Sequence, residues 1–319
     1  MATVRDIAKE AGVSVGTASR ALTGNGYVSE QNRALVLKAA EKLGYVPKEA
    51  PPKSRAVAVV LPDIIFPFMS AFLKYAEFEL SGLGYKTFVL NALSVQGRVE
   101  FVIDLLEKNE LDGVIINSEV TPDQLKKLEK YPVVGFEKMF GGKIPLVSSD
   151  HISGGKIAGE TLYKAGCKDV LILTVKQGIR VFADHRIEVC KQYLAERGVK
   201  CTVAEVDNQF LTFKFAPGIV SEYFSLYPNI DGIFADDVTA YCFAAEAVRR
   251  GIRIPEQLKI LGYDGNDITL LNYPRITTIV QDIPLIAAKC VELLLKRIEG
   301  EPVEGQTLIP VRLQKGDTI

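Results

Sequence analysis

From Val57 onward, short apolar runs alternate with longer amphipathic stretches, and this alternation restricts the possible folds more than any other feature of the sequence. Helical stretches near Phe68–Leu83 and Val99–Lys108 separate apolar runs at Val57–Leu61, Thr87–Leu90, Gly113–Asn117 and Val133–Phe136. Strands that alternate with helices build βαβ units, whose parallel strands form a sheet covered by helices on both faces. We therefore predict an α/β fold with doubly wound parallel sheets.

A second series of the same kind follows the first. Its helical stretches lie near 154–165, 186–197 and 238–250, and its apolar runs are Val170–Val175, Val203–Val206, Ile230–Ala235 and Ile260–Tyr263. These runs are too many for one small sheet, so we predict two lobes, with a ligand crevice between them at the carboxyl ends of the strands. We expect residues 56–319 to form this core, with lobe one over about 56–150 and 280–299 and lobe two over about 151–279 and 300–319.

Common sequence markers of nucleotide and dinucleotide binding are absent. The sequence holds no G-x-G-x-x-G and no G-x-x-x-x-G-K-[ST] motif, and its one G-x-S-x-G match, at 12–16, does not follow a predicted strand as the nucleophile turn of a hydrolase does. His151 and His185 have no second ligand at metal-binding spacing, so we interpret both as ordinary surface or cleft residues. We expect no cofactor, no metal and no catalytic residues.

The cysteines indicate a reducing compartment, and the apolar runs indicate a chain that does not cross a membrane. No apolar run approaches the roughly 20 residues that cross a bilayer, and no signal-peptide block opens the chain. The cysteines are odd in number and scattered, which favours reduced, mostly buried thiols over a disulfide framework. They are Cys167, Cys190, Cys201, Cys242 and Cys290. We expect a cytoplasmic protein with no membrane partner.

The first 55 residues differ from the rest of the chain in charge. They hold nine Lys and Arg against five Asp and Glu, a net charge of +4, whereas the remaining residues hold 29 basic and 34 acidic groups, a net charge of −5. A basic segment beside an acidic body is typical of a segment that meets a polyanion such as nucleic acid. Solvated helices carry similar excesses, so the charge leaves both interpretations open.

Three short helices are predicted in residues 1–46. Each follows a residue that can cap its first turn, namely Thr3, Ser14 and Ser29, and Gly12 can end the first helix in a left-handed turn. The second helix covers Val15–Leu22. Two short helices joined by a tight turn are typical of a helix-turn-helix, whose second helix enters the DNA major groove. A generic helical bundle is the alternative.

These residues carry a family resemblance. The stretch V-R-D-I-A-K-E-A-G-V-S-V-G-T-A-S-R-A-L, Val4–Leu22, resembles the DNA-binding signature of the LacI/GalR family of bacterial transcription regulators. The body is similar to the periplasmic-binding-protein-like core of that family at Val59–Ile64, Phe234–Asp237, Leu261–Asp264 and Thr277–Asp282. The resemblance implies a helix-turn-helix domain at 1–46 joined to a two-lobed core that binds a small, sugar-like effector.

The resemblance also implies which residues of the helix-turn-helix domain at 1–46, here called the head, contact DNA. Arg20 can bind guanine bidentately or hold a phosphate, while Thr17 and Ser19 are short donors suited to backbone oxygens. Val15 and Gly16 offer apolar contact or close approach. The full implied set is Thr3, Ser14, Val15, Gly16, Thr17, Ser19, Arg20, Asn25 and Tyr27.

For the effector, the resemblance implies contacts in the crevice between the lobes. The residues are Asp63, Ile64, Phe68, Glu137, Arg186, Phe210, Phe213, Asp236 and Asp264. Carboxylates accept sugar hydroxyls, the guanidinium supplies a fork of donors, and an aromatic ring stacks on a pyranose. Each aspartate has a plainer alternative as a helix cap, Asp237 before Val238 above all, and Arg186 has one as the partner of Glu188.

The linker, residues 47–55, departs from the family pattern. It lacks the Leu of the family's short hinge helix and contains Pro51-Pro52, which remove two backbone donors and favour extended geometry. We predict that the hinge helix is shortened or absent.

Three functions are compatible with these patterns. We expect a repressor of a carbohydrate-use operon that binds double-stranded operator DNA as a homodimer, because one helix-turn-helix covers only half of a two-fold site. A sugar-binding sensor with weakened or lost DNA regulation is the alternative that the linker suggests. An enzyme is the third possibility. It would have only Asp236 and Asp264 as an acid/base pair, and we expect no enzymatic activity.

Overall fold

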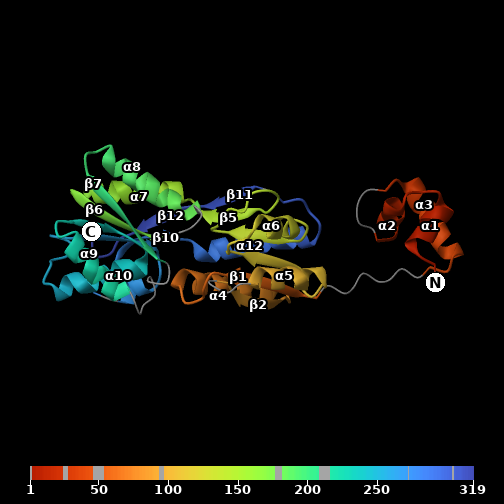
Figure 1. Cartoon of the computed structure of the whole chain (residues 1–319), viewed down its shortest axis with the longest axis horizontal. Coiled ribbons are helices and arrows are strands. Elements are labelled where there is room, and N and C mark those ends of the chain that lie inside the picture. Colours follow the sequence, from red (N-terminus) through yellow and green to blue (C-terminus); the bar gives the residue numbers. More distant parts are fainter. Residues whose placement is uncertain are drawn as a thin grey trace. The chain divides into compact units, whose positions relative to one another are not determined.

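The chain divides into two compact units, Met1–Ser54 and Arg55–Ile319. The computed structural model describes residues 2–23, 28–45, 54–92, 97–176, 182–207, 216–271, 273–303 and 305–319. Many of their helices and strands are labelled in Figure 1. The prediction of a shortened or absent hinge helix falls on 47–55, most of which lies outside the described residues.

The first unit is a three-helix domain. Its helices are α1 (Val4–Ala11), α2 (Val15–Thr23) and α3 (Glu30–Lys42). Thr3 and Asp6 form the predicted capping box of α1, and Gly12 ends that helix with a φ of 66°, which suits glycine. A small apolar core joins the three helices and consists of Ile7, Ala8, Ala18, Ala21, Val36, Ala39 and Ala40. The predicted helices are confirmed.

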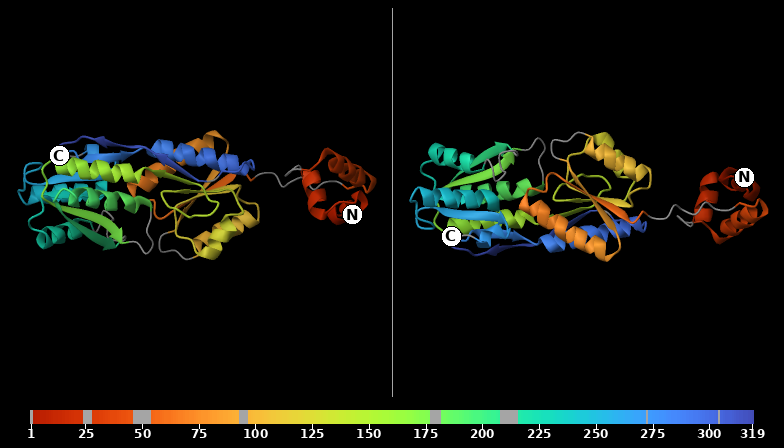
Figure 2. Two further views of the ribbon diagram at one scale, coloured as in Figure 1. Left: turned by 90° about the horizontal axis from the view of Figure 1, so that it is seen from above. Right: turned by 90° about the horizontal axis from the view of Figure 1, so that it is seen from below.

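The second unit contains two six-stranded sheets, one in each lobe (Figure 2). In lobe one the strand order is β11-β5-β4-β3-β1-β2. The elements of lobe one are β1 (Ala56–Leu61), α4 (Pro67–Gly82), β2 (Lys86–Asn91), α5 (Arg98–Glu107), β3 (Gly113–Ile116), α6 (Pro122–Leu128), β4 (Val133–Phe136), β5 (Leu146–Ser149), α12 (Ile283–Ile298) and β11 (Gln306–Ile309).

Lobe two repeats this architecture with the strand order β12-β10-β9-β8-β6-β7. Its elements are α7 (His151–Lys164), β6 (Asp169–Lys176), the 3-10 helix η1 (Phe182–Asp184), α8 (His185–Ala195), β7 (Lys200–Asp207), α9 (Ala216–Leu226), β8 (Gly232–Phe234), α10 (Asp237–Arg249), β9 (Lys259–Asp264), α11 (Ile268–Leu271), β10 (Thr277–Gln281) and β12 (Val311–Gln314). Both sheets are parallel except where β10 pairs antiparallel with β12.

Each sheet is covered on both faces, as the α/β prediction requires. In β1, Val57 and Val59 face the core under α4 and α12, while Ala58 and Val60 face the opposite core under α5 and α6. In lobe two, Leu171 packs toward α9 and α10. Successive strand residues point to opposite faces, so apolar strands without polar alternation are buried on both sides.

The chain crosses between the lobes three times. It passes from β5 to α7 at Asp150, from β10 to α12 at Asp282, and from β11 to β12 at Pro310. The two aspartates cap the helices that follow them. In Figure 1 the C-terminal strand β11 lies beside β5 in one lobe, and β12 lies beside β10 in the other.

One predicted lobe boundary needs a correction. We assigned 300–319 to lobe two, but β11 pairs with β5 in the sheet of lobe one. A four-residue edge strand has no periodicity that distinguishes the two sheets, so its partner is set by tertiary pairing. The alternation also gave no separate indication of α6, α9, β5 or β12.

Two properties of the described residues concern the environment of the protein. None of the described helices combines the length and the apolar character that a bilayer crossing needs. All five cysteines are free thiols, and Cys167, Cys190 and Cys290 are buried. Burial raises the pKa of Cys167 to about 12, which keeps that thiol protonated and unreactive. The expectation that most of the cysteines are buried is confirmed.

Candidate nucleic-acid interface and ligand site

Helix α2 presents one face to the core of the head and the other to solvent. Ala18 and Ala21 are buried between the helices, whereas Val15, Gly16 and Arg20 are exposed. The buried positions are three residues apart, which is the spacing of one helix face. The exposed face is therefore available to a groove of nucleic acid.

Local contacts fix the shape of this exposed face. The Ser14 hydroxyl accepts a hydrogen bond from the Thr17 amide at 3.1 Å and so caps α2, and the two hydroxyls lie 2.8 Å apart. A Cβ on Gly16 would lie 3.7 Å from Arg20 Nη2, so the guanidinium reaches back over the start of the helix. Arg20 thus presents its donors beside the first turn of α2.

The other predicted DNA contacts differ in exposure and in their hydrogen bonds. Thr3 is exposed, but its hydroxyl and amide both bind Asp6 in the capping box. Ser19 is half-buried. Asn25 and Tyr27 lie outside the described residues. The contacts with DNA stay predictions.

The candidate ligand site of lobe two lies at the carboxyl ends of β8 and β9. Asp236 follows β8 and caps α10: its carboxylate accepts hydrogen bonds from the Thr239 amide at 3.1 Å and the Thr239 hydroxyl at 2.6 Å. Asp237 is not the cap that we considered. It is the first residue of α10, fully buried, and accepts hydrogen bonds from Thr278 Oγ1 and the Asn266 amide.

Asp264 ends β9 in a strained conformation with a φ of 117°. Its carboxyl accepts a hydrogen bond of 2.7 Å from Gln281 Nε2. Burial raises the pKa of Asp264 to about 7, and the Asp236 and Glu137 charges act in the same direction, while Arg186 and Gln281 oppose them. This group therefore changes its charge near neutral pH.

Arg186 belongs to α8, and its charge acts on the carboxyl of Asp264. Its guanidinium covers the Tyr263 ring, with Cζ 4.2 Å from the ring centroid. Helix α8 approaches α7 closely because Gly155 has no side chain; a Cβ there would overlap the backbone of Arg186. Arg186 and the carboxyls of Asp236 and Asp264 thus form one electrostatic group.

Glu137 follows β4 of lobe one and is buried. Its carboxylate accepts hydrogen bonds from the Ser149 amide at 2.7 Å, from Ser148 Oγ at 3.0 Å and from His151. Burial alone would raise the pKa of Glu137, but the charge and hydrogen bond of His151, together with the two serine bonds, lower it. Glu137 is therefore ionised and fully paired.

Two hydrogen-bonded connections join the lobes at this point. His151 bonds to Glu137 and to the Tyr263 hydroxyl. Ser149 of lobe one donates to Gln281 of lobe two at 2.6 Å, and Gln281 in turn donates to Asp264. Our interpretation of His151 as an ordinary surface or cleft residue is wrong: it is fully buried, since a carboxylate and a phenol satisfy both ring nitrogens.

Three predicted effector residues follow β1 in lobe one, two of them in the loop after the strand and Phe68 in the first turn of α4. Asp63 accepts a hydrogen bond of 3.1 Å from the Ile65 amide, which shapes the loop. Ile64 is exposed, whereas Phe68 belongs to the apolar core of the lobe. Phe210 and Phe213 lie outside the described residues. The contacts of all five with an effector stay predictions.

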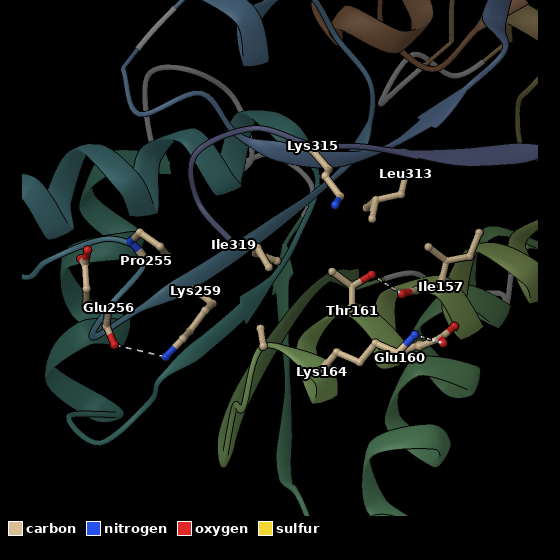
Figure 3. Close-up of a pocket in the computed structure, with 11 residues that line it drawn as sticks. Ile157, Glu160, Thr161, Lys164, Pro255, Glu256, Lys259, Leu313, Lys315 and Ile319 are labelled. Atoms are coloured by element: carbon tan, nitrogen blue, oxygen red, sulfur yellow. Dashed lines mark hydrogen bonds and ion pairs between the residues drawn. The ribbon is translucent and has the colours of Figure 1, made fainter.

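A separate cavity of about 880 Å³ lies in lobe two (Figure 3). Its lining residues are Ile157, Glu160, Thr161, Lys164, Ala165, Pro255, Glu256, Lys259, Leu313, Lys315 and Ile319. None of them is a predicted effector contact. Lys259 begins β9 and Asp264 ends it, so the cavity and the candidate site are roughly 16 Å apart along the strand. Charged and polar groups of both lobes converge instead at Asp264, in the candidate ligand site.

Comparison with known proteins connects both units of the chain to one family. Residues 3–48 match bacterial regulatory proteins of the lacI family, and residues 160–319 match a periplasmic binding protein-like domain. The chain is 30% identical over 331 residues to the sucrose operon repressor of Streptococcus mutans, with all of both chains covered. The chain belongs to the LacI family. This explains why a helix-turn-helix head precedes a two-lobed core.

Further relatives of the LacI family agree. The ribose operon repressor of Bacillus subtilis is 32% identical over 317 residues, covering 95% of this chain and 94% of its own. A LacI family transcriptional regulator from Enterococcus faecium, solved with bound ribose, is 27% identical with a TM-score of 0.72 and covers 82% of this chain and 98% of its own. These relatives are transcription regulators.

Sequence reasoning missed the buried partners of the candidate site. Tyr263 and Gln281 lay within recognised motifs, but neither was assigned a part, and His151 was set aside. A usable signal existed: a histidine directly after a strand and a capping aspartate, at a point where the chain changes lobes. Among the described residues, no group of three or more His, Cys, Asp and Glu is arranged to hold a metal ion.

Proposed function

We propose that this protein is a transcription repressor that binds operator DNA through α2 and releases or tightens that binding in response to a sugar-like effector. The observation that carries the proposal is the exposed face of α2, which presents Arg20 while Ala18 and Ala21 hold the helix on the head. The relatives repress sucrose and ribose operons. Such a protein works at the chromosome, so we place it in the cytoplasm.

For the head, we propose that Arg20, Thr17 and Ser19 bind bases and phosphates, with Val15 and Gly16 against base edges. Ser14 shapes the same face through its cap. Thr3, Asn25 and Tyr27 complete the proposed set. A helix-turn-helix contacts half of a two-fold operator, so two heads are needed for one site.

For the core, we propose that Arg186, Asp236 and Asp264 bind the sugar hydroxyls. The carboxylates keep free lone pairs after their internal hydrogen bonds, and the guanidinium donates. Asp63, Ile64, Phe68, Phe210 and Phe213 are the proposed apolar and loop contacts. Glu137, whose carboxylate is bonded to Ser148, Ser149 and His151, supports the same site from lobe one. A sugar can change operator affinity only by binding two lobe arrangements with different affinity.

We propose that the homodimer forms at the β2 edge of lobe one. Phe78 of α4 is 72% exposed, and Phe88 and Val89 of β2 are 48% and 45% exposed. β2 is the last strand of its sheet, and an uncovered apolar edge strand invites pairing with another chain. A second copy of this chain is the fitting occupant, since two-fold DNA requires two heads.

A duplex selection from random sequences, followed by a salt titration, tests DNA binding. We expect one enriched pseudo-palindromic site, with a log–log salt slope near 0.9 per neutralised phosphate. Failure to enrich any site, or a slope near zero, would contradict the repressor and leave the sugar-binding sensor.

A thermal-shift screen tests the effector. The panel is ribose, sucrose and cellobiose with their phosphates, and we expect at least one to raise the melting temperature. Arg186→Lys should abolish that shift, because one ammonium cannot replace the guanidinium fork. Turnover of the sugar would instead support an enzyme.

A further inference from the structure

A row of buried polar side chains crosses from lobe one to lobe two. Glu137 follows β4, His151 opens α7 directly after the first crossover, and Tyr263 lies in β9. His151 Nε2 lies 2.5 Å from Glu137 Oε2, and His151 Nδ1 lies 2.9 Å from the Tyr263 hydroxyl oxygen. His151 and Tyr263 are fully buried and Glu137 nearly so, so water does not replace these partners.

Packing alone does not call for this row. Removing a carboxylate and its polar partners from water is costly, and apolar side chains of the same volume would fill the space without that cost. The surroundings are nonetheless shaped for it: a Cβ on Gly154 of α7 would collide with the Tyr263 hydroxyl. We therefore interpret the row as a device that holds the side chains next to it in fixed positions.

The geometry that it fixes is that of Arg186. The Tyr263 hydroxyl is tied to His151, and the Tyr263 ring supports the guanidinium at 4.2 Å. His151 is tied in turn to Glu137 in the other lobe. A shift of lobe one relative to lobe two therefore changes the surface on which Arg186 rests.

We propose that Glu137, His151 and Tyr263 form an interlobe strut that positions Arg186 for the effector. The inference rests on the proposed function, in which Arg186 binds the sugar. These three are positioning residues, and Glu137 acts through His151. Because the strut ties a ligand-binding group of lobe two to lobe one, the sugar binds best in one lobe arrangement.

Two variants cut the strut at one bond. Tyr263→Phe removes the hydroxyl and keeps the ring under Arg186, while His151→Gln keeps an amide near Nε2 for Glu137 and loses the bond to Tyr263. Tyr163→Phe is the matched control, since Tyr163 is exposed on α7. The full chain is titrated calorimetrically with whichever of ribose, sucrose and cellobiose gives the largest thermal shift.

We expect Tyr263→Phe and His151→Gln to weaken sugar binding about tenfold and Tyr163→Phe to leave it unchanged. The ratio of operator dissociation constants with and without sugar should move toward one in both strut variants. Operator affinity without sugar should stay the same. A lower melting temperature with an unchanged ratio means a merely structural part and overturns the proposal.

Arg186→Lys separates this proposal from the one it rests on. If Arg186→Lys loses sugar affinity and Tyr263→Phe keeps it, the strut is wrong and the site stands. If Arg186→Lys binds normally, or no sugar binds the wild type, the site fails and the strut's part fails with it.

Nuclear magnetic resonance tests the strut without a ligand. The chain has two histidines, so His185→Gln leaves His151 as the one ring in the spectrum. We expect Tyr263→Phe to shift the Nδ1 resonance of His151, and Glu137→Gln to shift the Nε2 resonance of the same ring. If either nitrogen keeps its resonance, the strut is absent in solution.

Discussion

The exposed face of α2 and the interlobe network of the core solve the same problem, presenting polar groups to a ligand, in opposite ways. In the head, Arg20 is exposed, and its neighbours within one turn set its position. In the core, Arg186 and Asp264 depend on Tyr263 and Gln281, which come from other elements. The head's surface is local in sequence, whereas the core's site is assembled over long range.

This difference separates how the two sites fail. A substitution on α2 removes a contact and leaves the head folded, unless it reaches the small core beneath. A substitution in the core changes the position or charge of a neighbour that it touches, because buried polar groups share their partners. Four predictions test this contrast.

The largest effect is expected beneath α2. Ala18 is fully buried, so Ala18→Asp places an unpaired carboxylate in a core of seven small and medium residues and should unfold the head. We expect specific operator binding to disappear in a mobility-shift assay while the sugar-induced thermal shift of the core persists. Leu37→Asp adds the same charge at an exposed site of α3 and should bind. Loss of the sugar response in Ala18→Asp would contradict the independence of the two units.

A slightly smaller loss is expected from separating the two heads. Phe88→Lys puts a charge on the exposed edge strand β2 and should yield monomers in analytical ultracentrifugation. Operator affinity should fall about 100-fold, because the second head loses its high effective concentration. Lys86→Arg on the same strand is the control that keeps the charge unchanged. A Phe88→Lys protein that stays dimeric would move the interface elsewhere.

Removal of one contact on α2 should cost less. Arg20→Ala should weaken operator binding about 10- to 100-fold, as one bidentate base contact is worth about 1–3 kcal/mol. The melting temperature should not change, because Arg20 is exposed. Arg20→Lys distinguishes the two uses of this residue: it should restore affinity if Arg20 holds a phosphate and fail if it reads guanine. Equal affinity of Arg20→Ala and wild type would exclude Arg20 from the interface.

The smallest effect is expected from protons. Since the pKa of Asp264 is about 7 in the folded protein and its ordinary value is 3.8, this carboxyl stabilises the folded state at low pH and loses that contribution as the pH rises toward 7. Sugar hydroxyls bind the ionised form better, so sugar affinity should rise up to about tenfold between pH 6 and pH 8. Asp264→Asn should bind weakly with no such pH dependence in calorimetry. An unaltered pH profile in Asp264→Asn would assign the titration to another group.

The parts that could be predicted are those with local causes. The three helices of the head were predicted from Thr3, Ser14, Ser29 and Gly12, because caps and left-handed turns act within a few residues. Strands β1 to β4 of lobe one and β6 to β9 of lobe two were predicted from apolar runs, since strands buried on both faces tolerate few polar residues, whereas β5, β10, β11 and β12 were not.

The partners of the site could not be predicted in the same way. Glu137 and Tyr263 are 126 residues apart, and no periodicity links them through His151. The same limit applied to β11, whose four residues fit either sheet until its partner strand is known. The same limit applies to two adjacent residues, Asp236 and Asp237. Asp236 caps α10, whereas Asp237 is buried, and only the contacts of Asp237 with Thr278 and Asn266 explain its burial.

The order of residues alone specified a capped three-helix reader, two wound lobes and a family, because caps, helical periodicity and apolar strands are short-range properties. Folding decided which lobe received β11, that His151 lies between a carboxylate and a phenol, and that burial brings Asp264 near its titration point. Those outcomes depend on distances between segments that meet only after the sheets form, and on the cost of hiding charge from water.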